Sequence, residues 1–168
     1  MTKYLKIWWI WTRVTSQVAL TSRFGVIMFL VGKILRFGFF LLFLIILGSR
    51  TTAISGYSLW QMIFFFLTFN LIDTLPQLFF REVYRFRSYV VSGDFDYILT
   101  KPISPLFRSL LGGSDVLDFS ILILSVIFIF FSVGQIGAVH PLEIVLYILL
   151  IFNAFLIALA LHILVLGV

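Results

Sequence analysis

"LEIVLYILLIFNAFLIALALHILVLGV", residues 142–168, decides the fold class of this chain, because the run is apolar on every face and contains a single carboxylate. The hydrocarbon core of a bilayer is roughly 30 Å thick, and a helix needs about 20 apolar residues to cross it. A transmembrane strand would be about ten residues long and would alternate polar with apolar positions. The stretch therefore predicts a transmembrane helix.

Three other stretches are long and apolar enough to cross a bilayer in the same way. They are residues 24–48, 59–80 and 115–134. Of the 168 residues, 62% are hydrophobic and only 11% are charged, whereas soluble proteins carry about 25% charged residues. So few charges cannot cover the surface of a soluble domain. We expect an all-α integral membrane protein, with residues 1–168 forming a single transmembrane domain.

Several kinds of chemistry are excluded by what the sequence lacks. There is no cysteine, which excludes disulfides, thiol catalysis and cysteine-ligated metal sites. There is also no G-x-x-x-x-G-K-[ST] loop, the element that cradles ATP phosphates. No catalytic pair or metal-ligand cluster is visible, so we expect no enzyme activity, cofactor or metal. The net charge of +5 reports topology in a membrane chain, and we expect no nucleic-acid partner.

The basic residues indicate the orientation of the predicted spans. Most of them precede the first span or lie between the second and third, whereas Arg50 alone lies between the first and second. Lys and Arg accumulate in cytoplasmic loops. The N-terminus and residues 81–114 are therefore predicted to be cytoplasmic, with Ser92 inside and with Ser55 and His140 outside.

Residues 1–23 are predicted to form an amphipathic helix that lies in the membrane interface. Apolar residues recur at helical spacing on one face and polar residues on the other. The apolar face comprises Ile7, Trp11, Val14 and Val18, and the polar face comprises Lys6, Arg13 and Gln17. Tryptophan suits the headgroup level, where its ring and its N–H both find partners. The alternative is an ordinary aromatic belt at the start of the first span.

The predicted cytoplasmic loop, residues 81–114, has the pattern of two helices separated by a break. Gly93 stands where a C-cap glycine belongs, and Asp94 can cap the short helix that follows. Pro102 and Pro105 prevent that helix from continuing. A short amphipathic helix between two spans is suited to docking a cytoplasmic partner.

The same loop contains the pattern Ile/Val–x–x–Gly–Asp–Leu/Phe–Asp–x–x–Leu–x–Arg/Lys–Pro. The matching residues are Val90, Gly93, Asp94, Phe95, Asp96, Leu99, Lys101 and Pro102. With this motif and with the order of its predicted helices, nearly the whole chain resembles the permease subunits of ATP-binding-cassette (ABC) transporters of the type-2 exporter class. The resemblance is to their small six-span branch in particular.

The resemblance implies that the loop, from Gly93 to Pro102, carries a coupling helix that docks on a separate cytoplasmic ATPase subunit. It also implies a second permease subunit, in a homodimer or a heterodimer, and a location in the cell membrane. Members of that branch have six spans, so we expect this chain to be truncated after its fourth span. Two functions remain open: a permease that forms part of a translocation pathway, and a truncated or non-transporting scaffold that anchors a cytoplasmic partner.

Four polar residues inside the predicted spans are further candidates: Lys33, Arg36, Asn70 and Asp73. Ionisable residues in a membrane are costly and indicate function or pairing. Asn70 and Asp73 share a helix face and could line a substrate path; alternatively, Asp73 pairs with a basic residue of the first span. At 1.5 Å per residue, Arg36 and Asp73 lie at one depth, which predicts an Arg36–Asp73 contact. Lys33 lies about one turn lower and could extend to the headgroups.

The remaining polar and glycine positions have structural interpretations. Gly112 and Gly113 indicate a turn before the third span. His140 has no evident partner in its outer loop, whereas His162 is expected to be buried and hydrogen-bonded. Three serines of the third span are expected to bond to backbone groups or to neighbouring helices: Ser120, Ser125 and Ser132.

Overall fold

The computed structural model describes residues 2–50 and 56–167. Over these residues the chain forms α-helices and no β-strand, as predicted. The helices are α1 (Thr2–Thr21), α2 (Arg23–Arg50), α3 (Leu59–Phe80), α4 (Val83–Ser92), α5 (Asp94–Leu99), α6 (Pro105–Leu110), α7 (Asp118–Ile136) and α8 (Pro141–Leu166). Ser55, which we expect on the outer side of the membrane, falls outside the described residues.

The helices α2, α3, α7 and α8 are long and apolar enough to cross a membrane, which confirms the four predicted spans. Helix α3 has the predicted bounds, and α2 and α8 differ from prediction by one or two residues at each end. Helix α7 begins at Asp118 and not at residue 115. The Asp115 carboxylate accepts a hydrogen bond from the Leu117 N–H at 3.0 Å, which holds the preceding residues in a turn.

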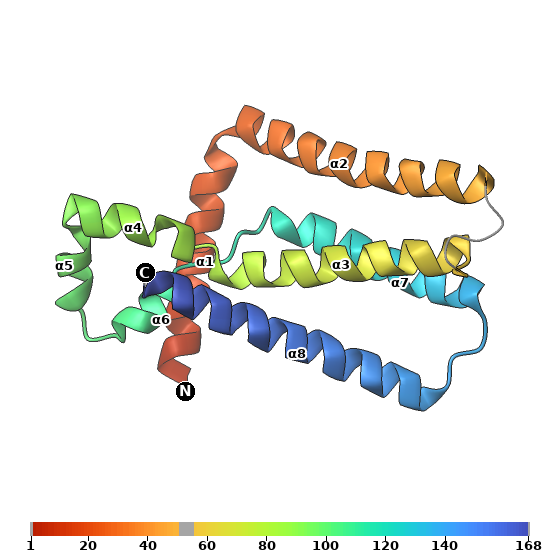
Figure 1. Ribbon diagram of the computed structural model, residues 1–168. Helices are drawn as coiled ribbons and strands as arrows, with labels where there is room; N and C mark the ends of the chain where they lie inside the picture. Colours follow the sequence, from red (N-terminus) through yellow and green to blue (C-terminus); the bar gives the residue numbers. More distant parts are fainter. Residues whose placement is uncertain (1, 51–55, 168) are drawn as a thin grey trace.

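Figure 1 shows α2, α3, α7 and α8 running side by side, while α1 crosses one end of this group at a steep angle. Helices α4, α5 and α6 lie at that same end, as do the N- and C-terminal ends of the chain. We call this the α1 end of the molecule. The arrangement places α4 and α5, which carry the sequence motif, beyond the ends of the four spans.

Helix α3 is the centre of the packing. Its Ile63 and Leu67 are buried together with Phe37 of α2 and Ile129 of α7. Helices α3 and α7 are also joined by the Ser132 hydroxyl, which donates to the Trp60 carbonyl at 3.0 Å. By contrast, Phe37 is the one buried residue among the described residues of α2, and α8 contributes none. The spans therefore form a packed α3–α7 pair flanked by two more loosely attached helices.

The other two serines of α7 behave differently from each other. Ser120 donates to the backbone carbonyl of Leu117 at 2.8 Å, as expected. Ser125 is fully buried, but its hydroxyl has no hydrogen-bond partner among the described residues, so the prediction for this residue is wrong. Small residues at this position allow α7 to approach its neighbour closely.

The loop between α3 and α7 breaks where the sequence indicates. Gly93 has φ +81°, a left-handed conformation suited to glycine, and its N–H donates to the Val90 carbonyl at the end of α4. The predicted capping by Asp94 is wrong, because α5 starts directly after Gly93 and Asp94 is already its first residue. The Asp94 carboxylate accepts a hydrogen bond from the Ser92 hydroxyl at 2.6 Å. The short helix α6, whose N-cap is Ser104, was not predicted.

Candidate functional site

Apolar side chains are exposed at the corner between α4 and α5. Val91, Tyr97 and Leu99 are 78%, 66% and 53% exposed. Phe95, which the motif marks as an apolar docking residue, is only half-exposed and packs edge-to-face on Phe86 of α4 at 5.1 Å. Phe95 therefore holds the two helices at their angle, while Leu99 and its neighbours form the free surface. We call Val91, Tyr97 and Leu99 the corner patch.

The end of the motif is attached to α1. The Lys3 ammonium donates to the Pro102 carbonyl at 2.9 Å. Lys101 donates to the Tyr97 hydroxyl at 2.6 Å and lies over the same ring, 3.8 Å from its centroid. Asp96 stays exposed in the first turn of α5, where its negative charge favours the helix N-terminus. The contacts of Lys3 and Lys101 restrain the C-terminal end of α5.

Part of the predicted apolar face of α1 packs on the protein. Trp11 belongs to that apolar face, and its ring lies 6.1 Å from that of Phe107 and under the Arg108 guanidinium at 4.7 Å. Trp8 stacks on Phe79 at 6.0 Å. The amphipathic pattern could not distinguish a face that contacts lipid from one that contacts α6, because both are apolar.

The glycine pair before α7 is a packing point as well as a turn. Gly113 has φ +141°, and a Cβ atom there would lie 2.8 Å from the Thr15 hydroxyl of α1. A Cβ atom at Gly112 would lie 2.0 Å from the Arg108 guanidinium and 2.4 Å from Glu82. The next N–H, that of Ser114, donates to the buried Thr12 hydroxyl at 3.2 Å. Glycine therefore lets this loop fit between α1 and the Glu82 site.

Glu82 is a buried carboxylate at the junction of α3 and α4, with only 3% of its surface exposed. It accepts hydrogen bonds from Arg108 of α6 at 2.8 Å and from the Tyr89 hydroxyl at 2.7 Å, and it also pairs with Arg85 at 3.4 Å. Through Arg108 and Trp11 this charge connects α3, α6 and α1. We call this the Glu82 site.

A second buried carboxylate, Asp118 at the start of α7, is not exposed at all. It pairs with Lys33 of α2 and with Arg81 at 3.5 Å, and Arg81 also pairs with Asp115. The two cations and two carboxylates balance, which a low-dielectric setting requires. We call these four residues the Asp118 network. The expectation that Lys33 extends to the headgroups is wrong, because a buried carboxylate of another helix lies within its reach.

Arg81, Asp115 and Asp118 are not among the site residues predicted from the sequence. A signal was present, since two carboxylates three residues apart lead directly into the apolar run of α7. On a helix or a turn this spacing brings them to one side. What the sequence could not show is that this side faces α2 and the end of α3.

Asp73 and Arg36 do meet, as the depth argument predicts. The distance between Arg36 Nη2 and Asp73 Oδ2 is 3.8 Å, and the two side chains are 70% and 37% exposed. Asn70 does not extend this site: it is buried, and its amide donates to the Phe66 carbonyl one turn back at 2.8 Å. The polar strip proposed for this face is therefore reduced to Asp73.

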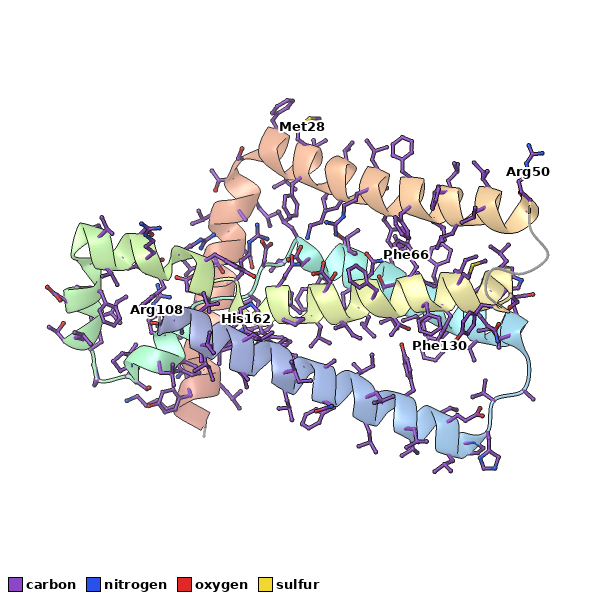
Figure 2. All side chains as sticks on the ribbon, in the orientation of Figure 1. Met28, Arg50, Phe66, Arg108, Phe130 and His162 are labelled. Carbon is purple, nitrogen blue, oxygen red and sulfur yellow. The ribbon has the colours of Figure 1, made fainter. Side chains whose placement is uncertain are left out.

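The two histidines are both held by hydrogen bonds. His140 caps α8 by accepting from the Leu142 N–H at 3.3 Å, and its own N–H donates to Glu143 at 3.0 Å, so the expectation that it lacks a partner is wrong. His162 is half-buried near the α1 end of α8, in the position labelled in Figure 2. Its ring contacts the Ala158 carbonyl at 2.7 Å, as expected of a hydrogen-bonded imidazole.

A groove of about 260 Å³ runs between α3 and α8. Its walls are mainly apolar, with Phe69 and Leu161 among them. Asp73 lines it from α3 and His162 from α8. Tyr84 of α4 also lines the groove, and its hydroxyl lies 3.4 Å from Nε2 of His162.

Comparison with known proteins gives the family. A family model described as ABC-2 family transporter protein matches residues 34–167. The chain belongs to this family. No curated protein and no solved structure matches it significantly.

With its four apolar helices, this ABC-2 family chain is a multi-pass membrane protein of the permease type, as the loop motif suggested. The permeases of this family are membrane components and are not themselves catalytic. The match begins within α2, so α1 lies outside it. It includes α4, α5 and three members of the Asp118 network, Arg81, Asp115 and Asp118, whereas Lys33 lies just before its first residue.

Proposed function

We propose that this ABC-2 family protein is a permease subunit that forms part of a translocation pathway and is driven by a separate ATPase bound to its α4–α5 corner. The N-terminus and the α1 end lie in the cytoplasm of the cell, and the spans lie in its cell membrane. A second permease subunit completes the pathway. Helix α1 lies in the interface between the cytoplasm and the bilayer, which its steep angle to the spans supports (Figure 1).

The observation that carries this proposal is the corner patch. Helix α5 lies at the extremity of the α1 end (Figure 1), and its Tyr97 and Leu99 are exposed. Buried apolar anchors supply most of the energy of protein interfaces. Gly93, in its left-handed conformation, sets α5 at an angle to α4 and so presents the patch outward.

The contacts of α4 and α5 provide a route from the docked ATPase to the spans. Helix α4 follows α3 after two residues, and its Val83 is buried against Phe80 and Leu110. The Glu82 site fixes this junction to α6 and α1. A displacement of α5 would therefore move the cytoplasmic end of α3, and with it the pathway.

The docking proposal predicts that Leu99→Asp abolishes ATPase association, because a charge would replace an apolar anchor in the interface. The tagged protein is purified from its native membranes in mild detergent, and co-eluting ATP hydrolysis is measured. Leu106→Asp is the matched control, since Leu106 of α6 is 49% exposed, close to the 53% of Leu99, but lies outside the corner patch. Undiminished ATPase recovery with Leu99→Asp contradicts the proposal.

The orientation predicts a labelling pattern. The chain contains no cysteine, so single cysteines can be placed at Ser92 and His140 without background. A membrane-impermeant thiol reagent added to intact cells should label the variant at His140 and should label the variant at Ser92 only after the cells are opened. Labelling of the Ser92 variant in intact cells would reverse the orientation.

A further inference from the structure

We propose that the groove between α3 and α8 binds an amphipathic molecule with a cationic head, with Asp73 as the counter-charge for that head. The substrate class that follows, a cationic amphiphile, rests on the proposed transport function. The binding site itself does not, because it is defined by residues of this chain alone.

The charge of the groove selects the head group. Asp73 is the one carboxylate that lines it, and no Lys or Arg of the described residues does so. The Asp73 carboxylate makes a single ion pair, through Oδ2 to Arg36 at the long distance of 3.8 Å, and no hydrogen bond among the described residues. A carboxylate has about four acceptor positions. Asp73 is thus under-satisfied inside a span, where an ammonium or guanidinium head would stabilise it.

Besides Asp73, the polar residues that line the groove are Gln77, Tyr84 and His162, and the last two contact each other. The His162 Nδ1–H donates to the Ala158 carbonyl at 2.7 Å, and Nε2 contacts the Tyr84 hydroxyl at 3.4 Å. Neither nitrogen is free to bind an anionic or carbonyl head group in place of the protein. Gln77 is neutral and can bond to a cationic or an anionic head, whereas the Asp73 carboxylate attracts a cation and repels an anion.

The apolar walls of the groove favour a hydrocarbon chain as the rest of the bound molecule. Phe69 and Ile72 of α3 and Leu161 of α8 give an apolar lining next to Asp73. The volume of about 260 Å³ lies just below the roughly 300–1,000 Å³ of sites for drug-sized ligands, so the groove would hold the head and only part of a hydrocarbon chain. Asp73 lies eight residues before Arg81, or about 12 Å along the helix, so the head would bind at membrane depth with its hydrocarbon part along these walls. A small hydrophilic cation could not gain from such a lining.

The test uses the purified protein in nanodiscs of phosphatidylcholine, a lipid without net charge. The probe is dodecylamine that carries a fluorescent group at the end of its chain, and binding is followed by fluorescence anisotropy. A dodecyl sulfonate with the same fluorescent group is the matched anionic probe. We expect the wild type to prefer the amine, and equal affinity for the two probes would overturn the proposal.

Two substitutions give opposite results if the proposal holds. Asp73→Asn should weaken amine binding by about tenfold or more, the loss of one charge-assisted hydrogen bond. Arg36→Gln should strengthen it, because the competing cation is gone. If the Arg36–Asp73 pair served only to hold the fold, both substitutions would weaken binding. That result, or an unchanged affinity of Asp73→Asn, contradicts the proposal.

A third variant covers the possibility that the charge variants do not fold. Leu161→Trp fills the groove from α8, where the side chain is 58% exposed, and leaves the ion pair intact. We expect amine affinity to fall with an unchanged elution profile in size-exclusion chromatography, and full affinity would place the bound amine elsewhere. ATPase association is not involved in these measurements. A negative result for amine binding would therefore not contradict the docking proposal, and a negative result for ATPase association would not contradict the binding site.

Discussion

Two basic residues one turn apart on α2 meet very different carboxylates. Lys33 pairs with Asp118, which is fully buried among α2, α3 and α7 and shares a second cation, Arg81. Arg36 pairs with Asp73 at 3.8 Å, with 70% and 37% of the two side chains exposed. The first site is closed and balanced, whereas the second is open and incompletely satisfied.

The difference teaches where the molecule is held and where it is free to interact. Among the described residues, two features mainly attach α2 to the packed α3–α7 pair. One is the buried ring of Phe37, and the other is the Asp118 network. Closed networks of this kind stabilise one arrangement, because removing any member leaves a buried charge unpaired. An open pair can exchange partners, which is what a binding site requires. The predictions below address this contrast, in order of decreasing effect.

The largest effect is expected from Asp118→Leu. Removal of this carboxylate takes away the ion-pair partner of Lys33 and leaves Arg81 paired with Asp115, so we expect a loss of about 3–5 kcal/mol in the free energy of unfolding. The measurement is the fraction of folded protein after heating in detergent, followed by size-exclusion chromatography. Asp96→Asn, a change at an exposed carboxylate of α5, is the control and should have little effect.

The double variant Lys33→Leu/Asp118→Leu sharpens this result. It removes one charge of each sign and leaves the Arg81–Asp115 pair neutral. We expect it to be less damaged than the sum of the two single variants, with a coupling free energy of about 1–3 kcal/mol. Additive losses would show that the two side chains do not act as a pair.

An intermediate effect is expected from Glu82→Gln at the other closed site. The amide cannot balance Arg108 and Arg85, so we expect a loss of about 1.5–3 kcal/mol, the range for hydrogen bonds to charged groups. The same thermal assay measures it, with Arg87→Gln as a control at an exposed charge of α4. A stability equal to that of the wild type would mean that Glu82 does not hold α6 and α1 in place.

The spans and the loop break were predictable because their signals are local. Hydropathy alone located four helices to within a few residues. Gly93 predicted the end of α4, because helices often end in a left-handed conformation that is costly for residues other than glycine. The helical rise per residue was enough to predict that Arg36 and Asp73 lie at the same depth in the membrane. The ion pair that this predicts is present.

The partners of Lys33, Trp11 and Phe95 could not be predicted, because each depends on which helix lies beside it. Lys33 and Arg36 are both basic residues of α2, and the sequence contains no measure of how close α7 comes to either. Trp11 lies on an apolar face that suits lipid as well as α6. Phe95 fits the motif as an exposed anchor, yet Phe86 was near enough to cover it.

The smallest effect is expected at the open pair, in the variants Arg36→Leu, Asp73→Leu and the double variant. Each single change leaves one charge inside a span, and the double change leaves none, so the double variant should be less damaged than the sum of the singles. The coupling free energy should nevertheless be only about 0.5–1 kcal/mol, because exposed side chains at 3.8 Å interact weakly and can reorient. Thermal stability in detergent measures all three, beside the Lys33–Asp118 cycle under identical conditions. A coupling as large as that of the Asp118 network would make Arg36–Asp73 a structural clamp, and it would remove the reason to regard Asp73 as available to a ligand.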